Sequence, residues 1–128
     1  MTDPLVTAAR AAQARAYAPY SNFRVGAALE SETGDIFVGC NVENASYGLT
    51  ICAERAAVCA AVSAGALRFR RAVVVSDSDP PAAPCGACRQ VLSEFGPDFR
   101  IDAIGPRARA SWTVAELLPA AFGRDQLS

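Results

Sequence analysis

The chain contains no histidine and no lysine, since all twelve of its basic residues are arginines. Without an imidazole, neither Ser-His-Asp nor Cys-His catalysis is available. Without a lysine, the chain cannot form a phosphate-binding loop of the Gly-x-x-x-x-Gly-Lys type or the Schiff base of a pyridoxal enzyme. Any catalysis by this chain therefore has to use carboxylates, thiolates or hydroxyls.

The sequence also lacks an excess of positive charge and any long apolar run. Its formal net charge is -1 and its isoelectric point is near 5.3, so no general positive field attracts nucleic acid or an anionic membrane. No stretch reaches the roughly 18 apolar residues of a membrane span, and the N-terminal segment does not have the pattern of a signal peptide. We expect a cytoplasmic protein that binds a small molecule, with neither nucleic acid nor a membrane as a partner.

Length and hydrophobic pattern indicate one α/β domain. With 128 residues, 52% of them hydrophobic, the chain is large enough for one core, and we predict a single domain over residues 1–128. Apolar spacing predicts helices over residues 4–18, 51–64, 85–95 and 115–122, and strands over residues 23–30, 36–40, 72–76, 101–104 and 110–114. Helices that alternate with strands after an initial hairpin predict a three-layer α/β/α sandwich on a mixed sheet of about five strands, with residues 72–76 as a central strand.

Five cysteines in a chain with no sign of secretion suit metal binding and packing better than disulfides. Cys85 and Cys88 stand three positions apart at a predicted helix start, so both thiols can face one metal ion. The same spacing also occurs in thiol-disulfide redox motifs. Cys52 begins another predicted helix, where the positive end of the helix dipole favours a thiolate. Two such helix starts that face each other would bring three thiolates to one ion.

A zinc ion with three thiolate ligands keeps one tetrahedral position for water, which is typical of a catalytic site. Glu54, two residues after Cys52, is a candidate proton shuttle at that position. Arg55 follows directly, and hydrogen bonds from its guanidinium to the sulfurs would offset the negative charge of three thiolates. Cys40 and Cys59 have no partner at a metal-binding spacing, and we predict that both are buried packing residues.

Several segments together resemble the small homotetrameric cytidine deaminases. A Cys-x-Glu helix start paired with a later Pro-Cys-x-x-Cys helix start is similar to the zinc-dependent nucleoside and nucleobase deaminases in general. The segments that resemble the cytidine deaminases are APYSNF at residues 18–23 with VGAA at 25–28, GCNVENASYG at 39–48, CAER at 52–55 and PCGACRQV at 84–91. These segments occur in the same order as in the family, and the resemblance covers nearly the whole chain, from residue 18 to the region of Phe122.

The resemblance implies hydrolytic deamination of cytidine and deoxycytidine to uridine and deoxyuridine plus ammonia, in pyrimidine salvage. It implies one Zn²⁺ per subunit, held by Cys52, Cys85 and Cys88. Glu54 would take a proton from the activated water, deliver it to N3 of the cytosine ring, and later protonate the leaving amine. The implied assembly is a homotetramer whose sites are shared between subunits.

The resemblance also implies substrate contacts, carried over residue by residue. Phe23 would pack on the base, Asn41 and Glu43 would hold the ribose hydroxyls, and the backbone of Ala53 would contact the pyrimidine edge. Three further residues would reach the site of a neighbouring subunit: Ala45, Tyr47 and Phe122. A carboxylate that faces a ribose hydroxyl discriminates against ligands that lack it, because the carboxylate is then left unpaired.

Other interpretations stay open at this point. Cys40 together with the three proposed ligands would make a structural four-cysteine zinc site in a non-catalytic domain, which gives Glu54 no role beside the metal. A deaminase of a cytosine-containing nucleoside antibiotic would share the zinc motifs. Deamination of cytosine within RNA or DNA is disfavoured by the acidic isoelectric point and by an acidic ribose contact that needs free hydroxyls.

Overall fold

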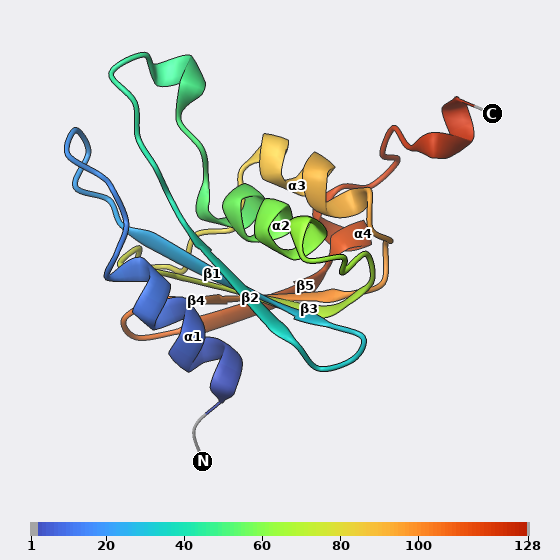
Figure 1. Cartoon of the computed structure of the whole chain (residues 1–128), viewed down its shortest axis with the longest axis horizontal. Coiled ribbons are helices and arrows are strands. Elements are labelled where there is room, and N and C mark those ends of the chain that lie inside the picture. The colour runs from blue at the N-terminus through green and yellow to red at the C-terminus, as the bar shows by residue number, and fades with distance from the viewer. Residues whose placement is uncertain (1–2, 128) are drawn as a thin grey trace.

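The computed structural model describes residues 3–127 and has an α/β architecture (Figure 1). Its strands are β1 (Val25–Ser31), β2 (Ile36–Cys40), β3 (Phe69–Ser76), β4 (Arg100–Ile104) and β5 (Arg109–Thr113). Its α-helices are α1 (Pro4–Gln13), α2 (Ala53–Ser63), α3 (Gly86–Ser93) and α4 (Val114–Leu117). Two 3₁₀ turns are η1 (Tyr47–Leu49) and η2 (Arg124–Gln126).

The strands form one mixed sheet in the order β2-β1-β3-β4-β5. The β3–β4 pair is parallel and the other neighbouring pairs are antiparallel. Helix α1 covers one face of the sheet, while α2, α3 and α4 lie on the other face (Figure 1). The predicted three-layer sandwich on a mixed sheet of five strands is confirmed, with the β-branched strand β3 at its centre.

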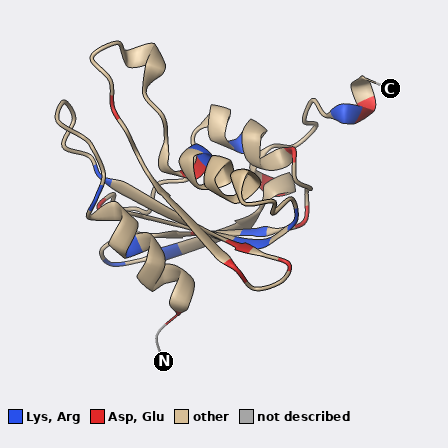
Figure 2. Ribbon diagram, viewed as in Figure 1, with Lys and Arg blue, Asp and Glu red and all other residues tan. Residues whose placement is uncertain are grey.

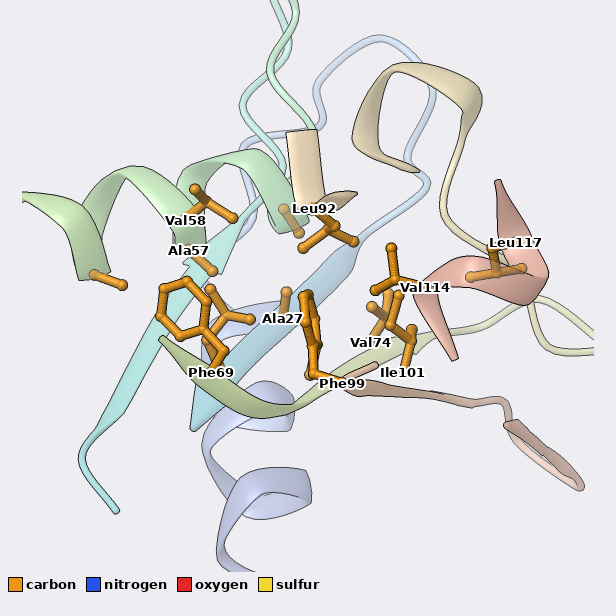
Figure 3. Packing of buried hydrophobic residues seen from close by; sticks show 14 residues of the cluster. Ala27, Ala57, Val58, Phe69, Val74, Leu92, Phe99, Ile101, Val114 and Leu117 are labelled. Carbon is orange, nitrogen blue, oxygen red and sulfur yellow. The ribbon is translucent and has the colours of Figure 1, made fainter. Parts of the chain in front are cut away.

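Buried side chains that alternate between the two faces of the sheet form two core clusters. Ala27 and Val74 point toward the face that carries α2 and α3, where they pack with residues such as Leu92 (Figure 3). Their neighbours Ala28 and Val73 point to the opposite face and pack against α1. Successive side chains of a strand face opposite ways, so a continuous apolar run in β3 supplies both clusters.

Helix α1 ends earlier than its alanine-rich sequence predicts. We expected it to continue to residue 18, but it stops at Gln13. The backbone amide of Tyr17 donates to the carbonyl of Asn41 at 3.0 Å, and the amide of Glu43 donates to the carbonyl of Tyr17 at 2.8 Å. This pairing needs extended backbone, so it competes with the helix. It also holds the loop after β2 against the segment that leads to Phe23.

Charged residues of both signs are interspersed over the ribbon (Figure 2). Arg71 of β3 forms ion pairs with Asp3 at the start of α1 and with Asp102 of β4, both at 2.6 Å, and so ties three elements together. Between residues 3 and 127, no helix is both long enough and apolar enough to cross a bilayer.

Gly39 lets α2 lie directly on β2. A Cβ atom at this position would come 2.4 Å from the amide nitrogen of Ala57 and 2.6 Å from the carbonyl oxygen of Ala53, which is closer than atoms can pack. Gly39→Ala should therefore lower the free energy of unfolding by about 2–3 kcal/mol, because α2 has to move away from the sheet. Urea unfolding of the purified variant measures the change.

The matched control is Gly48→Ala, where an added Cβ would meet no described atom within 4 Å. This substitution should change the free energy of unfolding by no more than about 0.5 kcal/mol. Equal stability of the two variants would contradict the proposed role of Gly39 in seating α2.

Candidate metal centre and substrate cavity

Three cysteine thiols meet where two helices begin. Cys52 is the N-cap residue of α2, Cys85 is the N-cap residue of α3, and Cys88 lies in the first turn of α3. The Cys52 and Cys85 sulfurs are 3.8 Å apart, the Cys85 and Cys88 sulfurs are 3.4 Å apart, and all three lie within 4.8 Å of one another. Both helices direct the positive ends of their dipoles at this cluster, which favours thiolates.

The electrostatics of the cluster favour a shared cation. A hydrogen bond with Cys88, followed by the Arg55 guanidinium, lowers the pKa of Cys52 to about 5 against the opposing effect of burial. The same contact with Cys52 raises the pKa of Cys88, and its burial and the charge of Glu54 act in the same direction. The two sulfurs thus compete for one proton, and a divalent cation bound between them would displace it.

Arg55 supplies positive charge beside the sulfurs. Its Nη2 donates to the Cys52 sulfur at 3.5 Å and to the carbonyl oxygen of Thr50 at 3.3 Å. Its Nε is buried and has no hydrogen-bond partner among the described residues. This placement agrees with the expected role of Arg55 in offsetting thiolate charge.

The donor set fits a single zinc ion. Tetrahedral ligands at the usual zinc-to-sulfur distance of about 2.3 Å lie about 3.8 Å from one another, close to the spacing of these sulfurs. The thiols of Cys52, Cys85 and Cys88 form the one metal-ligating group that residues 3–127 contain. Cys40 is not part of it, since it lines a hollow between α1 and β2 with residues such as Val38. The four-cysteine interpretation therefore has no geometric support.

Glu54 is buried beside the thiol cluster, with 8% of its surface exposed. Burial raises the pKa of its carboxyl to about 6, and the neighbouring Cys52 charge adds to the shift. Glu54 lines a cavity of about 190 Å³ together with Cys52, Cys85, Ala53, Asn41 and Phe23. Val25, Val74, Ala82 and Ala83 make much of the remaining wall apolar. Such a cavity, with few polar groups on apolar walls, suits a flat heterocyclic base.

The side chain of Asn41 hydrogen-bonds to the backbone around Phe23, just before β1 begins. Its side-chain Nδ2 donates to the carbonyl oxygen of Phe23 at 2.7 Å, and its Oδ1 accepts from the amide of Val25 at 2.9 Å. Asn41 is buried, whereas Phe23 remains 42% exposed. The structure thus brings these two predicted contact residues to the cavity that contains Glu54, and it shows that the Asn41 amide also orders the backbone on which Phe23 stands.

Glu43 lines a second, more polar cavity of about 310 Å³ with Tyr20, Ser21, Tyr47 and Thr50. Its carboxylate accepts hydrogen bonds from the amides of Tyr20 and Ser21 at 2.9 and 3.1 Å and from the Ser21 hydroxyl. The hydroxyl is the main reason that the pKa of Glu43 is lowered. Thr50 lines both cavities, so they adjoin. Glu43 itself is only partly buried.

Ser21 and Thr50 line the cavities but are not among the residues predicted from the sequence. Ser21 lies within a segment that carries the family resemblance, but its hydrogen bond crosses 22 positions of the chain and has no spacing signal. The Ser21 hydroxyl also accepts from the amide of Phe23 at 3.0 Å, so it joins the two cavities. Thr50 orders the loop by accepting from the amide of Asn44 at 3.1 Å.

The three residues expected to reach a neighbouring subunit are exposed. Ala45 and Tyr47 lie on the loop after β2, and 79% of the Tyr47 surface is accessible. Phe122 is 59% exposed on the C-terminal segment, which extends away from the sheet (Figure 1). It does not line the cavity of Glu54 in its own chain. Cys59 is exposed on α2, so the prediction of a buried position for it was wrong, because apolar spacing alone did not identify the outer face of that helix.

Three clustered thiols and a buried carboxylate at helix N-termini, on a mixed α/β sheet, define the class of zinc-dependent nucleoside and nucleobase deaminases. The model of the cytidine and deoxycytidylate deaminase zinc-binding region matches residues 2–101. The chain belongs to this deaminase family.

Individual relatives are similar to this chain over nearly its full length. A cytidine deaminase of Sporosarcina psychrophila is 45% identical over 130 residues, which cover 98% of this chain and 94% of that protein. A cytidine deaminase of Mycobacterium tuberculosis is 48% identical over 118 residues, covering 91% of this chain and 85% of that protein. The crystal structure of cytidine deaminase from Burkholderia pseudomallei matches with a TM-score of 0.90 and 49% identity, covering 95% of this chain and all of that one.

Proposed function

We propose that the chain catalyses the hydrolytic deamination of cytidine and deoxycytidine to uridine and deoxyuridine plus ammonia, in pyrimidine salvage. One observation carries the proposal: the buried carboxyl of Glu54 shares an apolar-walled cavity with two thiols of a zinc-fitting cluster. The likeness over nearly the whole chain to proteins named cytidine deaminase supports the choice of substrate.

Cys52, Cys85 and Cys88 would hold the zinc ion, with Arg55 beside them. When bound, zinc supplies Lewis-acid activation of a water molecule near neutral pH. Three thiolates carry more negative charge than one Zn²⁺ neutralises, and the Arg55 guanidinium at the Cys52 sulfur offsets part of that excess.

Glu54 moves the protons of the reaction. Its carboxylate takes a proton from the attacking water and delivers it to N3 of the cytosine ring, which makes C4 more electrophilic. The water oxygen forms the new bond at C4. Glu54 then takes the second proton from the new C4 hydroxyl and passes it to the exocyclic amine, the C4–N bond breaks, ammonia leaves, and the C4 carbonyl of the product forms. One carboxyl therefore acts as base and then as acid, and the apolar walls around it exclude competing solvent.

The two adjoining cavities would bind different parts of the substrate, the base in the cavity of Glu54 and the ribose toward the cavity of Glu43. Phe23 packs on the base, the backbone of Ala53 contacts the pyrimidine edge, and Asn41 and Glu43 hold the ribose hydroxyls. The support is their position: the first three line the cavity of Glu54, and Glu43 lines the neighbouring polar cavity that Thr50 joins to it.

We also propose a homotetramer in which Ala45, Tyr47 and Phe122 reach a neighbouring site. The loop at residues 41–50 carries a single charged residue (Figure 2). It exposes large apolar side chains, and a nearly uncharged apolar surface of this kind favours a protein partner. The number four follows from the family resemblance. Light scattering should give a mass four times that of the 13.4 kDa chain.

The single domain at residues 1–128 and the cytoplasmic location belong to the same proposal. All five cysteines are free thiols, and a thiolate metal site needs a reducing compartment to stay reduced. Neither nucleic acid nor a membrane is proposed as a partner.

The test is incubation of zinc-loaded protein with cytidine and, separately, with cytidine monophosphate, with ammonia and metal content measured together. We expect ammonia from cytidine and much less from the monophosphate. Absence of ammonia from cytidine in a zinc-loaded sample would overturn the proposed function. Equal use of the monophosphate would contradict a cavity fitted to the free nucleoside.

Ser21→Ala should raise the KM for cytidine about tenfold and leave kcat nearly unchanged, because the lost hydroxyl fixes Glu43 and contacts no reacting atom. Steady-state kinetics measure both constants. Ser21→Thr keeps the hydroxyl and should restore most of the affinity. A fall in kcat with an unchanged KM would place Ser21 elsewhere in the mechanism.

A further inference from the structure

Arg89 connects the peptide that presents Cys85 to the C-terminal part of the chain. It lies on α3, one residue after Cys88, and its side chain is partly buried. Its Nε donates to the carbonyl oxygen of Pro84 at 2.7 Å, and its Nη1 donates to the carbonyl oxygen of Leu117 at 2.9 Å. One guanidinium thus holds two carbonyl groups that lie 33 positions apart, one next to Cys85 and the other at the end of α4.

The three thiols are held in different ways. Cys88 is fully buried, so packing fixes its side chain. Cys52 accepts a hydrogen bond from Arg55. Cys85 is exposed, and as the N-cap of α3 it makes no capping bond with its side chain. Within residues 3–127, its sulfur has polar contacts only with the other two thiols of the cluster, so the place of its Cα depends on the peptide that precedes it, whose carbonyl Arg89 holds.

Pro84 strengthens the effect of the hydrogen bond from Arg89 to its carbonyl oxygen. Its side chain is fully buried and its ring fixes its own φ, so the peptide between Pro84 and Cys85 has little freedom once its oxygen is bound. A guanidinium can donate along two fixed directions at once, whereas an ammonium group has no such planar fork. The two carbonyls that Arg89 joins match this geometry.

We propose that Arg89 is a positioning residue of the metal site, which sets the sulfur of Cys85 in place and makes α4 part of the same scaffold. The inference rests on the proposed zinc ligands. On the same helix, the side-chain nitrogen of Gln90 donates to the carbonyl oxygen of Phe122 at 2.9 Å. Adjacent residues of α3 therefore hold different points of the C-terminal part: Arg89 holds the end of α4, and Gln90 holds the segment at Phe122.

The test measures the zinc affinity of the full-length chain by competition with a chromophoric chelator, without substrate. Arg89→Lys and Arg89→Gln, each able to reach one carbonyl, should bind zinc about 10- to 100-fold more weakly than the wild type. In cobalt-loaded protein, the same variants should lose intensity in the thiolate-to-cobalt charge-transfer band, because one sulfur no longer lies in place.

Two controls separate this role from general stability. Arg70→Lys, at an exposed position of β3, also removes a guanidinium that donates to a backbone carbonyl, that of Glu32. Gln90→Leu changes the same helix without touching Pro84. Both should bind zinc within about twofold of the wild type. Arg89 variants that melt earlier but bind zinc as the wild type does would overturn the proposal.

A measurement on the wild type keeps the proposal testable if the Arg89 variants do not fold. Zinc binding should slow hydrogen exchange of the Leu118 amide at the C-terminal end of α4, which donates to the carbonyl of Val114, the first residue of that helix. Slowing confined to residues 52–55 and 85–88 would contradict the link. A wild type that binds zinc and releases no ammonia from cytidine would overturn the proposed function but not the role of Arg89.

Discussion

Replacing Glu54 with glutamine is expected to lower kcat for cytidine by about 10³- to 10⁴-fold and to leave one zinc ion per chain in place. Glutamine has nearly the same shape and fits the same buried space, but its amide cannot accept a proton from water or return one to the leaving amine. In the proposed mechanism one carboxyl serves both transfers, so both would be lost together. Ammonia release under saturating cytidine, with metal analysis of the same sample, measures the effect.

The matched control is Glu94→Gln, which neutralises an exposed carboxylate that pairs with Arg124 at 3.1 Å. This change should leave kcat within about twofold, because an exposed ion pair contributes little. Turnover by the Glu54 variant within tenfold of the wild type would contradict the proposed proton transfers. Loss of zinc from that variant would indicate that Glu54 supports the metal instead.

Replacing Cys88 with serine should remove the metal and the activity together. Cys88 is the fully buried member of the thiol cluster, and serine fills its space without supplying a thiolate. We expect zinc content below about one tenth of the wild-type value after dialysis, and no measurable ammonia release, because two thiolates bind zinc far more weakly than three. Because ligand binding stabilises the folded state, the melting temperature should also stop rising with added zinc.

Cys40→Ser is the matched control, and it also tests the four-cysteine interpretation. Cys40 lies in the hollow between α1 and β2, outside the thiol cluster. Its serine variant should keep a full complement of zinc and wild-type turnover. Loss of zinc from the Cys40 variant would restore the structural four-cysteine site and remove the main argument for catalysis.

The fold was predictable to a large extent because its strands and helices carry strong periodic signals. Residues 36–40 were predicted as a strand and form β2 with those bounds, and the β-branched run in β3 was correctly placed at the centre of the sheet. Helix ends were less predictable. Alanine is compatible with continued helix after Gln13, and only the pairing of Tyr17 with the loop after β2 ends α1 there.

The metal centre was predictable from spacing and helix starts, whereas the arrangement of the substrate contacts was not. Cys52 and Glu54 stand two residues apart at one helix N-terminus, so local geometry brings them together. The bonds from Ser21 to Glu43 and from Gln90 to Phe122 span 22 and 32 positions. Neither has a sequence period, because each depends on how separate loops pack in the folded chain.

The separation of the zinc ligands along the chain sets the order of events during folding. Cys85 and Cys88 are neighbours in sequence, but Cys52 is 33 positions before Cys85, and strand β3 lies between α2 and α3. An unfolded chain offers only the close pair, and two thiols hold zinc weakly. Tight capture of the metal has to wait until β3 has paired and brought α2 beside α3. A chain emerging from the ribosome would therefore acquire zinc late, once most of its core is already assembled.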